Sequence, residues 1–164
     1  MRHSAIYPGT FDPLTLGHYD LIERASGIFD RVIVAVAEHS RKKTLFTVAE
    51  RVDLARRATR KLPNVVVKPF RGLLIDFARD QKIHVLVRGI RAFSDFEYEF
   101  QMALTNRKLA PGIETLFLMP KEAYSYINSS TVREIAERGG DIRGFVPAGL
   151  VGPIQRKCRG GRDR

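Results

Sequence analysis

The stretch Tyr7-Pro8-Gly9-Thr10-Phe11-Asp12-Pro13-Leu14-Thr15-Leu16-Gly17-His18 contains the end of a predicted strand, a turn and the start of a helix. The strand is the short apolar run Ala5 to Tyr7. The proline and glycine residues of the stretch favour a tight turn that exposes backbone N–H groups. The N-terminus of the helix that follows adds partial positive charge. The stretch therefore predicts a loop suited to an anionic phosphate.

Four further apolar runs continue this pattern and are predicted as strands: Arg31 to Ala37, Val65 to Lys68, His84 to Val87 and Thr115 to Met119. Their continuous apolar character indicates burial on both faces, which is typical of parallel sheets. Helical periodicity fills the intervals between them. We therefore predict an α/β fold, a single doubly wound, Rossmann-like domain whose five-stranded parallel sheet is flanked by helices. Ligands bind such folds beyond the carboxyl ends of the strands.

Apolar residues recur at intervals of three and four in two of the helical segments: Leu21, Ile22, Ala25, Ile28 and Phe29, then Phe96, Phe100, Ala103 and Leu104. We expect both faces to cover the sheet, with Phe96 and Phe100 in the core. Two capping boxes, Thr47 with Glu50 and Ser94 with Glu97, mark helix starts. A last helix is expected around Pro147 to Lys157.

The composition suits one globular domain, because the 164 residues are 44% hydrophobic and 28% charged. Cys158 is the single cysteine, which excludes an intramolecular disulfide and a metal site built from several thiolates. The sequence has no apolar run of roughly 18 residues and no signal-peptide stretch near its start. We therefore expect a cytoplasmic protein with no membrane partner.

The net charge of +10 first suggests a nucleic-acid binder, because clustered cations displace counterions from phosphates. However, five basic residues and one acidic residue lie from Arg156 onward, so much of the excess belongs to the end of the chain. We expect a nucleotide-handling domain over residues 1–157 and a basic, disordered tail over 158–164. Nucleic acid is not expected as a partner.

Polar groups that suit phosphate follow several of the predicted strands. In the first loop, Thr10 supplies a hydroxyl and His18 a ring donor, although a histidine at a helix start is often an ordinary surface residue. After the fourth strand, Arg88-Gly89-Ile90-Arg91 presents two guanidinium groups that either bind phosphate oxygens or remain solvated.

A third group, Tyr124-Ser125-Tyr126-Ile127-Asn128-Ser129-Ser130-Thr131-Val132-Arg133, follows the fifth strand and opens a helix. Its small polar side chains and free N–H groups form an anion cradle or simply cap the helix. Arg41, Lys42 and Lys43 follow the second strand, and we expect at least one of them to face a phosphate. Three such groups at successive strand ends favour a phosphate site over coincidence.

Ordered motifs connect the sequence to a known family. Thr15-Leu16-Gly17-His18 and Ile127-Asn128-Ser129-Ser130 resemble the two signatures of the nucleotidyltransferase superfamily. Together with the first loop, the sequence resembles bacterial phosphopantetheine adenylyltransferases at Phe46 to Arg51, Val87 to Arg91, Asp95 to Glu99 and Phe117 to Pro120. The likeness runs from Ala5 to about Pro147. One departure is Asn128, where that family usually has Ser.

The resemblance implies an enzyme of coenzyme A biosynthesis that transfers an adenylyl group reversibly from ATP to 4′-phosphopantetheine. The products are dephospho-coenzyme A and pyrophosphate, and Mg²⁺ is the implied cofactor. It also implies coenzyme A as a product-like feedback ligand and a homo-oligomer, namely a hexamer. Since the acceptor phosphate is itself an anionic nucleophile, direct in-line attack needs no covalent intermediate.

The resemblance also assigns roles to residues. His18 is implied as the stabiliser of the transition state, and the implied catalytic set is His18, Thr10, Lys42, Arg88 and Arg91. The acceptor is expected at Thr10, Lys42, Leu74 and Arg88. The ATP-binding residues are expected to be Thr10, Phe11, His18, Gly89, Ile90, Arg91, Glu99, Tyr124, Ser125, Tyr126, Ile127, Asn128, Ser129 and Ser130.

The sequence leaves two alternative functions open. A related nucleotidyltransferase acting on nicotinate mononucleotide or glycerol phosphate would share both signatures. A phosphate-backbone binder would need no ATP turnover and would bind nucleic acid with a steep salt dependence. The sequence shows no carboxylate cage, so we expect Mg²⁺ to be held mainly by the ATP phosphates and water, without protein metal ligands.

Overall fold

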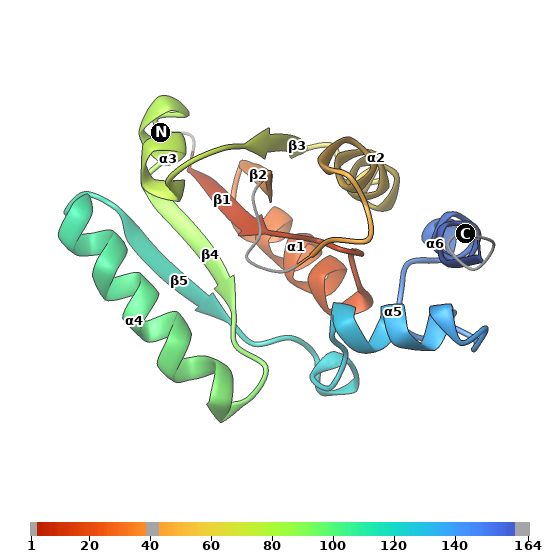
Figure 1. Ribbon diagram of the computed structural model, residues 1–164. Coiled ribbons are helices and arrows are strands. Elements are labelled where there is room, and N and C mark those ends of the chain that lie inside the picture. The colour runs from red at the N-terminus through yellow and green to blue at the C-terminus, as the bar shows by residue number, and fades with distance from the viewer. Residues whose placement is uncertain (1–2, 39–42, 160–164) are drawn as a thin grey trace.

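The computed structural model describes residues 3–38 and 43–159, without the side chains of residues 93 and 94. Strands and helices alternate along this part of the chain (Figure 1). Their order is β1 (Ser4–Gly9), α1 (Leu16–Ile28), β2 (Arg31–Ala37), α2 (Val48–Thr59), β3 (Val65–Phe70), α3 (Leu74–Asp80), β4 (Val85–Gly89), α4 (Phe93–Leu109), β5 (Glu114–Leu118), the 3₁₀ turn η1 (Glu122–Tyr124), α5 (Ser129–Glu137) and α6 (Ala148–Arg159).

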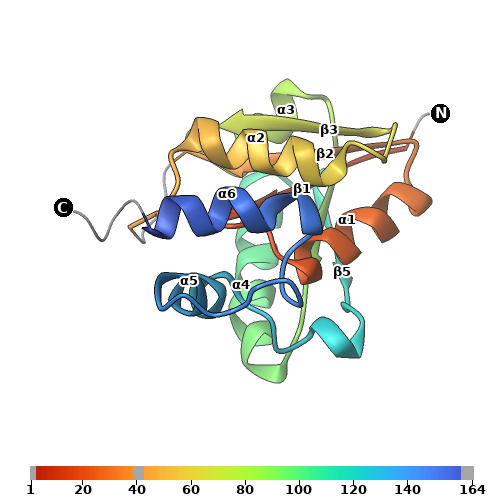
Figure 2. The ribbon, with the colours of Figure 1, turned by 90° about the vertical axis from the view of Figure 1, so that its right-hand side faces the viewer.

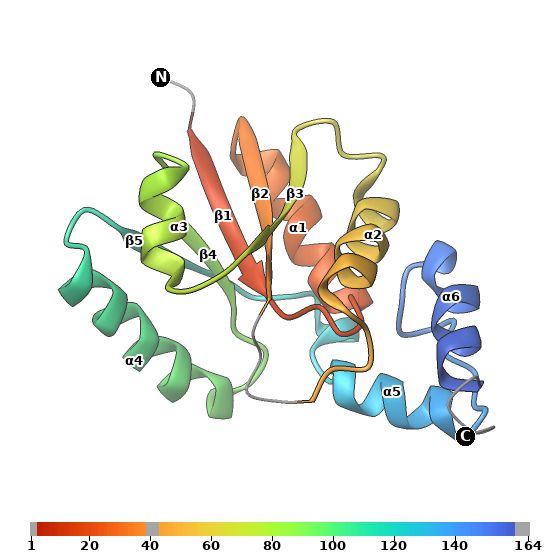
Figure 3. The same cartoon turned by 45° about the horizontal axis from the view of Figure 1, so that its top comes forward.

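The strands form one parallel sheet in the order β3-β2-β1-β4-β5. Ile6 of β1 pairs with Ile33 of β2 on one side and with Leu86 of β4 on the other. The strand order therefore reverses between β1 and β4, where loops leave in opposite directions and open a crevice. Figure 3 shows the arrowhead of β1 pointing to the region where α1 begins and α5 lies. The predicted doubly wound α/β fold is confirmed.

The sheet is buried on both faces because neighbouring side chains of a strand point to opposite sides. Ala5 and Tyr7 of β1 join the apolar cluster that includes residues of α1, α2, α5 and α6. Ile6, between them, joins the second cluster with Ile75 and Ala78 of α3. Figure 2 shows α6 beside α2, so the last helix closes the first face. This burial explains the continuous apolar runs of the sequence.

The helix and strand ends differ from prediction at three places that matter for the site. β1 continues to Gly9, so Pro8 and Gly9 belong to the strand and not to the turn after it. β4 continues to Gly89, so Arg88 and Gly89 are the last residues of the strand and not part of the loop after it. The capping box at Thr47 is confirmed, since its hydroxyl accepts from the Glu50 amide and the Glu50 carboxylate accepts from the Thr47 amide. The second capping box is wrong, because α4 begins at Phe93 and its N-cap is Ala92, without a side-chain bond.

The expectation that Phe96 and Phe100 belong to the core is also wrong. Their side chains are 42% and 45% exposed and stack on each other with ring centroids 5.5 Å apart. The inward position of this helix is taken by Glu99, which is buried. α4 lies along the edge strand β5 (Figure 1), and Phe96, Phe100 and Leu104 of this helix are exposed.

The predicted last helix is confirmed as α6, which includes Pro153 and keeps Cys158 buried. It continues to Arg159, two residues beyond the expected end of the domain at 157. The rest of the predicted tail, residues 160–164, lies outside the described residues, and the division into domain and tail stays a prediction. Among the described residues, no helix has the length and apolar character required to span a membrane.

Candidate active site

A cleft of about 660 Å³ opens at the carboxyl ends of β1 and β4, where the strand order reverses. This volume lies within the range of roughly 300–1,000 Å³ for small-molecule sites. The structure brings eleven of the predicted site residues together around it: Thr10, Phe11, His18, Arg88, Gly89, Arg91, Glu99, Ile127, Asn128, Ser129 and Ser130.

Other predicted site residues lie away from this cleft or outside the described chain. Leu74 begins α3 and packs against the second apolar cluster, on the opposite face of the sheet from α1. Ile90, Tyr124, Ser125 and Tyr126 flank residues of the cleft without lining it, and Tyr126 is 68% exposed. Lys42, with Arg41, lies outside the described residues.

The first loop has an unusual backbone that brings Phe11 inward. Phe11 has a φ of 50°, in the left-handed region, and its side chain is only 2% exposed. A Cβ at Gly9 would lie 2.7 Å from the Phe11 ring, so glycine is required there. The ring lies edge-on to His18, with centroids 5.2 Å apart. Phe11 therefore forms an apolar wall beside the His18 imidazole.

The orientation of His18 is set by the start of α1. Thr15 is the N-cap, and its backbone N–H donates to His18 Nδ1 at 3.1 Å. In return, the His18 backbone N–H donates to the Thr15 hydroxyl at 3.4 Å. Because Nδ1 acts as an acceptor, a neutral ring carries its proton on Nε2. The helix start thus leaves an Nε2–H donor for a ligand in the cleft.

The protonation state of His18 follows from its surroundings. Burial, followed by the positive charges of Arg91 and Arg88, lowers the pKa of His18 from 6.5 to about 4. The imidazole is therefore neutral near pH 7 in the ligand-free protein. The negative charge of a bound polyanion would oppose the positive charges of Arg91 and Arg88, and it would thereby raise the pKa of His18 and favour the imidazolium. His18 is thus poised to donate a hydrogen bond as a neutral group.

Arg88 and Arg91 are held in place by acidic partners and backbone carbonyls. Arg88 donates to both carboxylate oxygens of Glu99, at 2.7 and 2.5 Å, and to the Pro8 carbonyl at 2.8 Å. Arg91 donates to Asp95 at 3.0 Å and to the Ile127 carbonyl at 3.1 Å. A guanidinium group has five N–H donors, so each still has donors for a phosphate.

Asn128 performs the capping role that a serine would have at the same position. It is the N-cap of α5, and its side-chain oxygen accepts from the Thr131 backbone N–H at 2.8 Å. Asn and Ser are about equally good N-caps. The side-chain NH₂ group is left for other contacts. The N-terminus of α5, with Ser129 and Ser130, therefore faces the cleft as an intact anion-binding helix start.

Several residues of the cleft were missed by reasoning from the sequence. Asp12, Thr44 and Arg133 line it, and Arg51 lies behind it with only 1% of its surface exposed. A signal existed for Arg133, because a cation four residues after Ser129 lies on the same side of a helix start. Asp12 gave no such signal, since an acid in a phosphate-binding loop is unexpected from charge alone.

The carboxylates that line the cleft are all engaged by cations. Asp12 pairs with Arg133, Asp95 with Arg91 and Glu99 with Arg88. Within residues 3–38 and 43–159, no three His, Cys, Asp or Glu side chains are grouped to hold a metal ion. This donor set fits a metal ion that arrives with its phosphate ligands.

The crevice at the reversal of strand order and the anion-binding helix starts define a class of protein. Residues 6–135 match the cytidylyltransferase-like family model, so the chain belongs to this family of nucleotidyltransferases. The fold is also that of Plasmodium falciparum nicotinic acid mononucleotide adenylyltransferase complexed with NaAD. The two chains share 14% identity and a TM-score of 0.71, over 99% of this chain and 97% of the other.

Curated relatives identify the narrower family. The phosphopantetheine adenylyltransferase of Methylococcus capsulatus is 56% identical over 98% of this chain and 99% of its own length. That of Moorella thermoacetica is 57% identical over 87% of this chain and 89% of its own length. The chain belongs to the phosphopantetheine adenylyltransferase family.

Proposed function

We propose that the protein transfers an adenylyl group from ATP to 4′-phosphopantetheine, giving dephospho-coenzyme A and pyrophosphate. The observation that supports this most is the full-length similarity to phosphopantetheine adenylyltransferases, together with a cationic cleft at the strand-order reversal. Two polyanionic substrates have to meet in such a reaction, and their charges require several fixed cations around one cavity.

The proposed chemistry is a single in-line displacement. An oxygen of the acceptor phosphate forms a bond to the α-phosphorus of ATP, while the bond from that phosphorus to the bridging oxygen of the β-phosphate breaks. Pyrophosphate leaves with the bonding electron pair. His18 stabilises the developing charge on the α-phosphate through Nε2–H, and Arg91 stabilises it through its remaining donors.

The other predicted residues keep their proposed roles. Thr10, Arg88, Lys42 and Leu74 are proposed to contact the acceptor. The proposed ATP-binding residues are Phe11, Gly89, Ile90, Arg91, Glu99 and the segment from Tyr124 to Ser130. Gly89 lines the cleft, which supports its role, and it also packs closely against Leu21 of α1.

We propose that Mg²⁺ is held mainly by the triphosphate and water, because the carboxylates of the cleft already have cationic partners. The ion supplies charge neutralisation for the leaving pyrophosphate. We also propose that coenzyme A competes for the cleft as a product-like ligand. A cytoplasmic location remains a prediction.

Self-association is proposed through the outer side of α4 and the adjoining part of β5. Large apolar side chains are exposed there, among them Phe100 at 45%, Leu104 at 48%, Leu116 at 45% and Met119 at 73%. Large exposed apolar side chains in this number favour an interaction site. The family resemblance makes a hexamer the expected assembly.

The reaction is tested by mixing the purified protein with ATP, Mg²⁺ and 4′-phosphopantetheine and measuring pyrophosphate release. Nicotinate mononucleotide and glycerol 3-phosphate are run in parallel. Release with phosphopantetheine alone, with dephospho-coenzyme A identified by mass, is the expected result. Release only with another acceptor would refute the acceptor and keep the nucleotidyltransferase reaction, whereas no release with any acceptor would refute both.

A further inference from the structure

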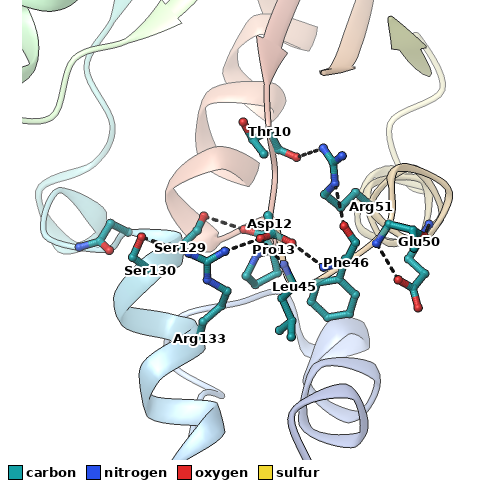
Figure 4. A network of polar contacts seen from close by, with 12 residues as sticks. Thr10, Asp12, Pro13, Leu45, Phe46, Glu50, Arg51, Ser129, Ser130 and Arg133 are labelled. Atoms are coloured by element: carbon teal, nitrogen blue, oxygen red, sulfur yellow. Dashed lines mark hydrogen bonds and ion pairs between the residues drawn. The ribbon is translucent and has the colours of Figure 1, made fainter. Parts of the chain in front are cut away.

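In the wall of the cleft, one carboxylate joins three segments that are far apart in the sequence. The Asp12 side chain is 4% exposed and accepts from the backbone N–H groups of Leu45 and Phe46, both at 2.9 Å. It also accepts from the Arg133 guanidinium. Figure 4 shows Asp12 between the loop before α2 on one side and α5 on the other. Asp12 thus ties the first loop to both neighbours.

Other hydrogen bonds strengthen the same junction. The guanidinium of Arg51, on α2, donates to the carbonyls of Thr10 at 2.8 Å and Phe46 at 3.2 Å (Figure 4). It also donates to the Ala37 carbonyl at 2.7 Å. The Ser129 hydroxyl donates to the Pro13 carbonyl at 2.8 Å. Hydrogen bonds within the chain therefore hold together the ends of β1 and β2, the loop before α2 and the start of α5.

All three joined segments contribute to the cleft. Thr10 comes from the first loop, Thr44 from the loop before α2, and Ser129 and Ser130 from the start of α5. Asp12 itself is an anion beside a site that suits phosphates, so by charge alone it would weaken substrate binding. Its oxygens already accept three hydrogen bonds, which leaves little capacity for a metal ion or a proton to be transferred. A role in positioning explains why an acid occupies this place.

We propose that Asp12 is a positioning residue for adenylyl transfer, which fixes the loop before α2 and the start of α5 relative to each other so that the two substrates align. This inference rests on the proposed function. Alignment affects the chemical step more than the affinity for either substrate, because in-line attack tolerates little displacement. Loss of the Asp12 carboxylate would take the hydrogen-bond acceptor away from the backbone N–H groups of Leu45 and Phe46.

The test compares Asp12→Asn with Asp53→Asn, an exposed carboxylate on α2 whose partner is Arg57. For Asp12→Asn we expect kcat to fall by about 30-fold or more, as a misplacement near 1 Å costs on the order of 10²-fold. The dissociation constants for ATP and 4′-phosphopantetheine, measured separately by calorimetry, should change less than about threefold on the same reasoning. Hydrogen exchange at the Leu45 and Phe46 amides should become faster. Asp53→Asn should match the wild type in every measurement.

Several results would overturn the proposal. An unchanged kcat in folded Asp12→Asn protein would do so, as would a loss of kcat matched by an equal loss of substrate affinity. If Asp12→Asn does not fold, Asp12→Glu carries the same expectation, because it keeps the charge but displaces the carboxylate from the Leu45 and Phe46 amides by one methylene group. Wild-type activity with nicotinate mononucleotide alone would instead refute the proposed acceptor, and the comparison would then be made with that substrate.

Discussion

The cleft and the outer side of α4 depart from the usual distribution of polar and apolar side chains in opposite ways. Around the cleft, charged and polar groups are buried and bound within the chain, as Arg51 and Asp12 illustrate. On α4, large apolar side chains such as Phe100 and Leu104 are exposed at nearly half of their surface. Polar groups in the interior and apolar groups on the surface both reverse the usual distribution, so each calls for a functional explanation.

The two regions differ in whether a single chain supplies all the partners of their side chains. Buried polar groups in the cleft have their hydrogen bonds in a single chain, so its geometry is set before substrates bind. The apolar side of α4 would be covered only by another surface, for which we propose a second copy of the chain. Changes in the cleft should therefore affect folding and catalysis, and changes on α4 should affect assembly.

The largest effect is expected for Arg51→Met, which keeps an apolar stem and removes the donors to the carbonyls of Thr10, Ala37 and Phe46 from a buried position. The loss should lower the free energy of unfolding by about 3–5 kcal/mol, as expected when buried polar groups lose their partners. Denaturant unfolding followed by circular dichroism measures it. Arg57→Met on the same helix, whose side chain is 56% exposed, is the matched control and should cost less than about 1 kcal/mol. Equal losses of unfolding free energy in both variants would contradict a stabilising role for the buried Arg51 guanidinium.

A somewhat smaller effect is expected for His18→Ala, which removes a donor from the cleft without disturbing its cationic frame. By comparison with the loss of one oxyanion donor, kcat should fall by about 10²-fold or more. The affinity for ATP should change little, because arginines and helix N-termini still bind the phosphates. Steady-state pyrophosphate release and calorimetry separate the two quantities. His84→Ala, at the opposite end of β4, should retain full activity, and an active His18→Ala enzyme would refute the proposed role.

A third variant addresses the other side of the comparison. Leu104→Glu places a charge on the apolar side of α4, and it should weaken self-association by about tenfold or more while the monomer stays folded. Sedimentation velocity over a range of protein concentrations measures this. Ile28→Glu is the matched control, because Ile28 is 59% exposed at the end of α1 and lies on a different helix. A Leu104→Glu protein with the wild-type assembly would show that α4 does not form the interface.

The sequence predicted the sheet well because burial on both faces leaves a strong local signal. The run Arg31 to Ala37 coincides with β2, and eleven of the residues predicted to form the site lie around one cleft. The error at Phe96 and Phe100 has a physical cause. Apolar spacing predicts an apolar helix face but does not show whether the rest of the chain covers that face.

The Asp12 junction also could not be predicted from the sequence. Its partners Leu45, Phe46 and Arg133 lie 33, 34 and 121 residues away, and two of the three donors are backbone amides that carry no residue identity. Long-range hydrogen bonds of this kind depend on how loops fold over the sheet. The sequence therefore indicated which residues could bind phosphate, and the structure revealed what holds them in place.

The smallest predicted effect concerns the titration of His18, which reports directly on the positive charges of Arg91 and Arg88 in the cleft. Without ligand its pKa should be about 4, and bound ATP should raise it, since an anion favours the imidazolium. Nitrogen chemical shifts in ¹⁵N-labelled protein measure both the pKa and the Nε2–H tautomer, with the His18→Gln spectrum identifying the signal.

The same shift predicts how stability depends on pH. His18 binds a proton more weakly in the folded state than in the unfolded state, where its pKa is 6.5. Its contribution is therefore fully present above pH 6.5 and is lost as the pH falls toward 4. Relative to His18→Gln, the wild type should gain stability over this interval as the pH rises. Parallel stability curves for the two proteins would mean that His18 is not desolvated by the cleft, and that the arginines do not act on it as the structure indicates.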